Sequence, residues 1–105
     1  MNVTLPTTLV LQALACGHRY GFDVMDATGL PSGTVYPVLR RLEKEGLVRA
    51  DWEDPQIARD EQRPPRRNYE LTASGEALLA TGRARYRMPR EIPNARGWKP
   101  SPSRS

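Results

Sequence analysis

Apolar residues recur at helical spacing in three stretches of the first half of the chain. The first stretch covers about residues 6–16, with Thr4 or Thr7 available as a cap and a glycine at its end. The second, FDVMDATG, carries a short apolar stripe that begins at Phe22 and stops before Gly29. This spacing predicts two consecutive helices, and the second is about two turns long.

The third stretch, TVYPVLRRLEKEG, has the clearest helical period. Its apolar residues Val35, Leu39 and Leu42 share one face, and polar side chains occupy the rest. Ser32 precedes the stretch, so we expect its hydroxyl to cap the first turn. Gly46 suits the left-handed position that follows a last helical turn. The pattern therefore predicts a third helix between these two residues.

After these helices the pattern changes to the alternation of polar and apolar residues that is typical of strands. The segments LVRADWE and RRNYELT both alternate in this way. Between them lies a polar and proline-rich interval, which we expect to be a long loop. A final apolar stretch, GEALLATGRARYR, begins after Thr72 or Ser74, either of which suits a helix start. The pattern thus predicts a hairpin and one more helix.

The predicted order is helix, helix, helix, strand, long loop, strand, helix. A helix-turn-helix followed by a β-hairpin describes a winged helix, so the expected fold class is mainly α (α+β). We expect residues 1–88 to form this one domain around a single core. Residues 89–105 are rich in Pro, Arg, Ser and Gly and have no apolar periodicity, which predicts a disordered basic tail.

Charge is distributed unevenly along the chain. Of its 105 residues, the first 53 carry five basic and six acidic side chains, and the remainder carry eleven and six. A second half with an excess of positive charge favours a polyanionic partner. No segment has the length and apolar character of a membrane span, and no signal peptide is visible, so a cytoplasmic protein is expected.

The sequence lacks the groupings that enzymes and metal sites need. One cysteine, Cys16, and one histidine, His18, form neither a metal cluster nor an internal disulfide. No nucleophile with a matching base and no glycine-rich phosphate loop is present, so we expect no catalysis, no metal and no cofactor. Glu43 is expected to pair with an Arg or Lys. Cys16 is expected to be buried, with redox sensing as the alternative, and Trp52 to lie in the core or at an interface.

Two separated segments carry a more specific pattern. SGTVYPVLRRLEKEGLV contains a Thr, an apolar residue and Tyr-Pro, followed by Leu, Arg-Leu-Glu and Gly-Leu. RPPRRNYELTASGEALL places basic residues and a Tyr before Leu-Thr, then a Gly and an apolar pair. In both segments, over about residues 9–80, the chain resembles the PadR family of winged-helix transcriptional regulators. The resemblance implies a nucleoid-associated protein that binds double-stranded DNA.

A winged helix of this kind presents its third helix to the major groove. We expect Arg40 to read a guanine edge, and Tyr36 and Lys44 to contact phosphates or nearby bases. The arginines around Pro64 are expected to make the wing tip a basic element against the minor groove or the flanking backbone. The alternative for both is a solvated surface. The candidate DNA-contacting residues are Ser32, Thr34, Tyr36, Pro37, Arg40, Arg41, Lys44, Arg63, Arg66 and Arg67.

The resemblance also implies a homodimer that pairs through the first and last helices. The candidate interface residues are Leu9, Leu14, Leu78, Leu79 and Tyr86. The chain departs from the family in showing no long C-terminal helix or separate domain of the kind that usually dimerises these proteins. A constitutive repressor is expected. A small-molecule effector is not indicated, and one would have to lie between the first and last helices of a dimer.

Two other functions are compatible with the same residues. An accessory protein of a phage or mobile element would bend or mark DNA, and its sites would cluster at attachment sequences instead of promoters. A winged-helix adaptor would bind only protein, and the basic third helix argues against it. The basic tail would either follow DNA phosphates without reading sequence or take no part in binding.

Overall fold

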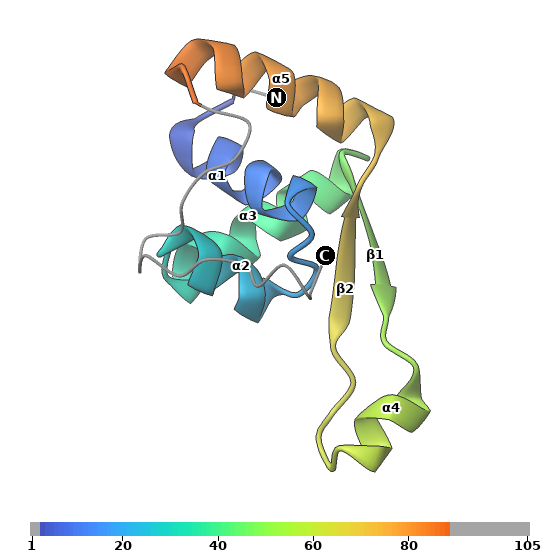
Figure 1. The fold of residues 1–105 in the computed structure, drawn as a ribbon. Helices are drawn as coiled ribbons and strands as arrows, with labels where there is room; N and C mark the ends of the chain where they lie inside the picture. Colours follow the sequence, from blue (N-terminus) through green and yellow to red (C-terminus); the bar gives the residue numbers. More distant parts are fainter. Residues whose placement is uncertain (1–2, 89–105) are drawn as a thin grey trace.

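Three helices from the first half of the chain pack together and carry a β-hairpin that projects away from them (Figure 1). The computed structural model describes residues 3–88. Its elements are α1 (Leu5–Ala15), α2 (Gly21–Thr28), α3 (Ser32–Lys44), β1 (Val48–Trp52), α4 (Pro55–Asp60), β2 (Arg67–Leu71) and α5 (Ala73–Tyr86). This arrangement confirms the mainly helical winged-helix fold. The predicted tail, 89–105, lies outside the described residues.

The core is built around α1, which packs against α2, α3, α5 and β2. Because it has neighbours on most sides, α1 buries its residues from Val10 to Leu14 almost completely. The predicted apolar face of α3 is confirmed, since Val35, Leu39 and Leu42 have no exposed surface. Burial of these side chains is what holds the opposite face of α3 outward.

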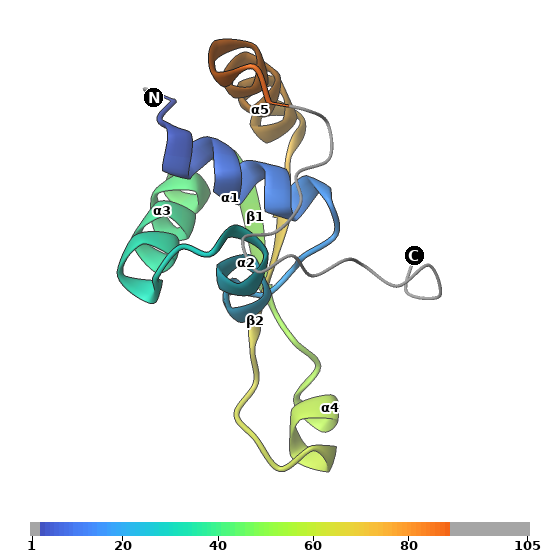
Figure 2. The same ribbon diagram turned by 60° about the vertical axis from the view of Figure 1, so that its left-hand side comes forward.

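The hairpin joins this core at its base and leaves it toward its tip. The strands are antiparallel, with Val48 opposite Leu71, Tyr69 opposite Ala50, and Trp52 opposite the first residue of β2. Val48 and Tyr69 are buried against the helices, whereas Trp52, at the outer end, is 64% exposed. The first part of the hairpin is therefore fixed by the core, and the rest extends beyond it (Figure 2).

Side-chain caps define where α1 and α5 begin. The Thr4 hydroxyl accepts a hydrogen bond from the amide of Thr7, and the Thr72 hydroxyl accepts one from the amide of Gly75. The structure thus selects Thr4 and Thr72 from the predicted pairs of caps. The prediction that Ser32 caps α3 is wrong. The chain already turns at the preceding proline, whose carbonyl accepts the first amides of α3, so Ser32 lies inside the first turn.

The interval predicted as a loop contains a short helix, α4, at the tip of the wing (Figure 1). Asp54 caps this helix by accepting a hydrogen bond from the amide of Gln56 at 2.9 Å, and Pro55 occupies its first position. An Asp-Pro pair is a helix-start signal, but only a single apolar side chain, Ala58, is buried by α4. The apolar period that predicts longer helices is therefore missing here.

Three residues expected inside the protein are exposed. Cys16 lies at the C-terminal cap of α1, where the helix leaves the core, and Phe22, expected in the apolar stripe of α2, is 63% exposed. The buried face of α2 consists of Gly21 and Val24 instead. Trp52 lies beyond the helices, so the expectation of a core position is also wrong.

Within residues 3–88, no helix has the length and hydrophobicity that crossing a bilayer requires.

Candidate nucleic-acid interface

The outward face of α3 presents three cations in one and a half turns. Arg40, Arg41 and Lys44 are all exposed, while Leu42, between them, belongs to the buried face. None of the three forms an ion pair with another side chain in the described part of the chain. Cations without an internal partner are available to neutralise an external anion.

The N-terminal half of α3 adds polar and aromatic groups to the same face. Ser32 and Pro37 are exposed, Thr34 is half-buried, and Tyr36 is 41% exposed. The Tyr36 ring lies directly over the backbone of Gly21 at the start of α2, since an added Cβ at Gly21 would overlap the end of the ring. Glycine at this position therefore sets where the Tyr36 hydroxyl is held.

Arg67, the first residue of β2, connects the wing to α3. Its Nη2 donates to Glu43 Oε2 at 2.7 Å, which confirms the expected salt bridge of Glu43 to a basic residue. The Arg67 guanidinium also stacks on the Trp52 ring, 5.1 Å from its centroid. Beside the ion pair of Arg67 and Glu43 lies a hollow of about 190 Å³, which we call the junction hollow. It is lined by Tyr36, Arg40, Glu43, Arg67 and Tyr69.

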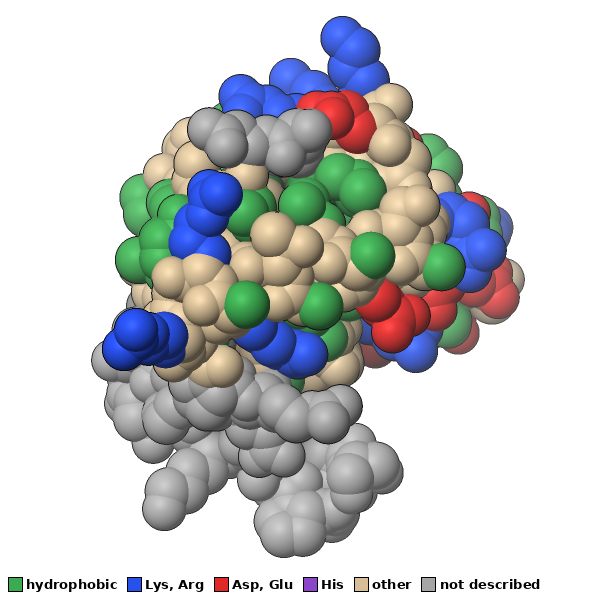
Figure 3. All heavy atoms as spheres, turned by 90° about the horizontal axis from the view of Figure 1, so that it is seen from above, with side chains coloured by type: hydrophobic (Ala, Val, Ile, Leu, Met, Phe, Trp, Pro, Cys, Tyr) green, Lys and Arg blue, Asp and Glu red, His purple; other side chains and the backbone are tan. Residues whose placement is uncertain are grey.

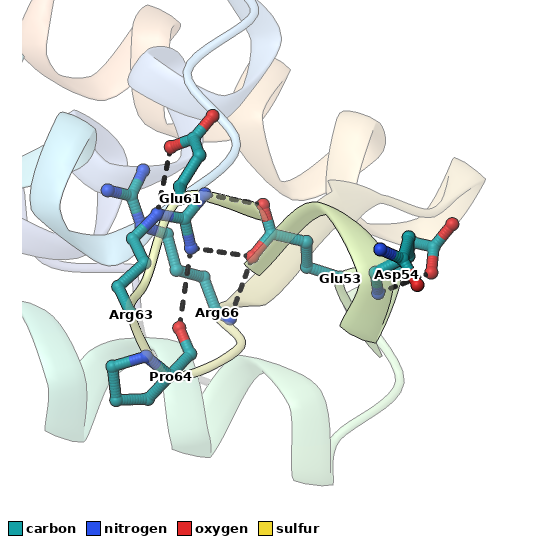
Figure 4. Close-up of polar contacts among 7 residues, drawn as sticks. Glu53, Asp54, Glu61, Arg63, Pro64 and Arg66 are labelled. Carbon is teal, nitrogen blue, oxygen red and sulfur yellow. Dashed lines mark hydrogen bonds and ion pairs between the residues drawn. The ribbon is translucent and has the colours of Figure 1, made fainter. Parts of the chain in front are cut away.

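The guanidinium of Arg63, a predicted DNA contact, is held within the wing by two carboxylates (Figure 4). Both of its terminal nitrogens donate to the carboxylate of Glu53, at 2.7 and 2.8 Å, and its Nε donates to Glu61 at 3.1 Å. Glu53 is 8% exposed and also accepts from the amide of Arg66. The Arg63 guanidinium holds the pKa of Glu53 below its usual range, so both members of this ion pair are charged at neutral pH.

The outer part of the wing carries a net negative charge. From Asp51 to Arg66 the sequence holds five acidic and three basic residues, a net charge of −2. One of the three, Arg63, is already neutralised, and the exposed Arg66 lies over the Tyr20 ring, 5.5 Å from its centroid. The predicted basic tip is therefore wrong in its net charge; Arg66 and Arg67 lie where β2 begins, and Arg67 contacts Glu43 of α3.

The residues predicted to form a dimer interface divide into two groups. Leu14 and Leu79 are 8% and 2% exposed and belong to the core of the chain itself. Leu9, Leu78 and Tyr86 are half-buried, and Leu5, which the sequence did not single out, is 43% exposed. Viewed from the side of α5, the surface shows hydrophobic side chains between basic ones (Figure 3).

Comparison with protein-family models assigns most of this chain to one family of regulators. The model of the transcriptional regulator PadR-like family matches residues 10–81, which include α2, α3 and the whole wing. No curated protein sequence matches the chain.

Solved structures of DNA-binding regulators have a similar fold. The chain is similar to a PadR family transcription regulator from Clostridium difficile, with 22% identity over 80% of this chain and 88% of that one and a TM-score of 0.68. A PadR family regulator from Eggerthella lenta is 26% identical over 76% and 72% of the two chains, with a TM-score of 0.59. BpsR of Bordetella bronchiseptica, whose DNA binding is regulated by 6-hydroxynicotinic acid, is 27% identical over 81% and 59%, with a TM-score of 0.62.

Proposed function

Because the chain belongs to the PadR-like family of transcriptional regulators, we propose that it is a repressor that binds a specific double-stranded DNA sequence as a homodimer. The observation that carries this proposal is the row of exposed cations on α3, Arg40, Arg41 and Lys44, none of which has an internal ion-pair partner in the described chain. A helix is narrow enough to enter the major groove, and Arg67, the first residue of β2, adds a cation beside it.

The interface that we propose follows from which groups are free to reach DNA. Arg40 reads a guanine edge, and Lys44 and Tyr36 contact the flanking backbone. Arg63 is left out, because Glu53 and Glu61 already occupy its donors. The proposed contact residues are Ser32, Thr34, Tyr36, Pro37, Arg40, Arg41, Lys44, Arg66 and Arg67.

The test of DNA binding is a gel retardation series with random-sequence duplex at low salt, repeated with the triple variant Arg40→Gln, Arg41→Gln and Lys44→Gln. Wild-type protein is expected to retard the duplex, and the variant, which should unfold at the same temperature, is expected not to. Absence of retardation by the wild type would favour a protein-binding adaptor. Mapping bound sites in cells then separates a repressor, whose sites overlap promoters, from an accessory protein that marks attachment sites.

Displacing the Tyr36 ring should lower DNA affinity with little effect on the stability of the fold. Gly21→Ala should change the free energy of unfolding by less than about 1 kcal/mol, because the half-exposed Tyr36 ring has room to turn away. DNA affinity should fall about fivefold, the decrease expected when one hydrogen bond to DNA is lost. Fluorescence anisotropy with a labelled duplex measures the change. Tyr36→Ala should cause the same loss, and the double variant should lose no more than either.

The proposed dimer uses the half-buried residues of α1 and α5. Leu9, Leu78 and Tyr86 lie beside the exposed Leu5 on elements that pack together. Two copies related by a two-fold axis would bury these side chains against their equivalents and would place two α3 helices about one helical turn of DNA apart.

Leu5→Glu is expected to shift the protein to a monomer at micromolar concentration, because pairing would bury a carboxylate without a partner. The first position of a helix accepts Glu well, so the folded protomer should keep its unfolding temperature. Ile57→Glu is the matched control, since Ile57 is 47% exposed but lies on α4 at the wing tip. Light scattering that finds a dimer in both variants, or a monomer in the wild type, would exclude this pairing.

A further inference from the structure

The junction hollow has the charge and the donors of an anion site. Two of its lining residues, Arg40 and Arg67, are cationic, and one, Glu43, is anionic, which leaves an excess of one positive charge. A phosphodiester group carries one negative charge. The hollow lies where the recognition helix meets the first residue of β2, on the side of the hairpin that faces α3.

Arg67 is held in a fixed orientation but has donors left over. A guanidinium has five N–H donors. Among residues 3–88, Glu43 accepts from Nη2 and the Tyr69 hydroxyl forms a further hydrogen bond with Arg67, so other donors remain. Stacking on Trp52 restricts the plane of the guanidinium, and the ion pair restricts its rotation in that plane. An arginine fixed in this way loses little side-chain entropy when it binds an anion.

The aromatic side chains of the hollow are suited to the same ligand. Burial raises the pKa of Tyr69 above its usual value, against the opposing effect of the nearby Arg67 charge, so its hydroxyl stays protonated at neutral pH. Tyr36 contributes a second phenol from α3. Protonated hydroxyl groups donate to phosphate oxygens without adding charge.

We propose that the junction hollow holds one backbone phosphate of bound DNA, that Arg67 is its principal donor, and that Glu43 and Trp52 position Arg67. The inference rests on the proposed DNA-binding function and adds a defined contact to it. A phosphate fixed between α3 and β2 sets how deeply α3 enters the groove.

The test compares Arg67→Ala with Arg49→Ala, measuring affinity for a random duplex across a series of chloride concentrations. Arg49 is the matched control, because it lies on the opposite face of the same hairpin and has a comparable ion pair, to Glu70 at 2.8 Å. Arg67→Ala should bind about tenfold more weakly at low salt. Its plot of log affinity against log salt should be shallower by about one unit, the contribution of one phosphate. Arg49→Ala should match the wild type both in affinity at low salt and in the slope against salt.

Equal affinities and salt slopes of the two variants would overturn the inference about Arg67 while leaving the proposed DNA binding intact. Absence of DNA binding by the wild type would overturn both proposals. A loss of affinity in Arg67→Ala with an unchanged salt slope would also overturn it, because Arg67 would then act only on the shape of the wing. Repeating the series with sodium phosphate at equal ionic strength distinguishes the source of the anion. Stronger competition by free phosphate in the wild type than in Arg67→Ala would support a site that DNA fills with a phosphate, whereas phosphate that binds without lowering DNA affinity would contradict a site for the DNA backbone.

Discussion

Gly75→Ala is expected to lower the free energy of unfolding by about 3 kcal/mol, the upper part of the range for overpacking a core. Gly75 lies in the first turn of α5, and an added Cβ would overlap the backbone carbonyl of Leu47 and press on the Leu71 side chain. The same carbonyl accepts the amide of Thr72, and the Thr72 hydroxyl donates to Gly46. The start of α5 is thus fastened to the turn that follows α3, and backbone atoms there have nowhere to move.

Thermal unfolding monitored by circular dichroism measures this effect, which corresponds to a decrease in Tm of roughly 12–24 °C for a domain of this size. Gly33→Ala is the matched control, because Gly33 is also in the first turn of a helix and has open space where the Cβ would be. It should leave Tm unchanged or raise it slightly, since alanine favours a helix. Equal stability of the two variants would mean that α5 does not pack on the α3–β1 turn as described.

Arg40→Ala is expected to reduce discrimination between the preferred DNA sequence and a scrambled one by about 5- to 150-fold, the range for one bidentate contact to a base. The Arg40 side chain is exposed in the middle of α3 and has no internal ion pair among the described residues, so its loss should leave folding unchanged. Binding to the scrambled duplex should weaken much less, because only one charge is removed. Anisotropy titrations with the two duplexes give both affinities.

Arg41→Ala serves as the control for Arg40, because it removes the same charge from the next position of the same helix. It should weaken binding to both duplexes by a similar factor, as expected for a contact to the backbone. If discrimination is lost in Arg41→Ala and kept in Arg40→Ala, the assignment of the two arginines to base and backbone is reversed.

The helical framework was predictable because its signals are local. Hydroxyl groups before α1 and α5 determine where these helices begin, and the spacing of Val35, Leu39 and Leu42 fixes which face of α3 is buried. With that face known, the exposure of Arg40 and Lys44 on the other side follows from helical geometry. The same reasoning gave the order of elements in the winged helix.

The wing was predicted less well because its structure depends on contacts between distant residues. The ion pair of Arg63 with Glu53 joins two charged residues ten positions apart. The sequence of the segment shows that an arginine is present, but not which carboxylate it pairs with. The alternation that placed Trp52 on the inward face did not reveal that the hairpin extends beyond the core at that point. Phe22 was misplaced because the close packing of Gly21 on α3 decides which way α2 faces.

The most direct test of the central claim is a selection of bound sequences from a random duplex library, with the full chain at near-physiological salt. The account predicts enrichment of an inverted repeat with half-sites about one helical turn apart, and loss of preference at a position in each half-site when Arg40→Ala is selected in parallel. Binding without enrichment, vanishing as salt increases, would contradict a sequence-reading dimer and leave only nonspecific attraction to the DNA backbone.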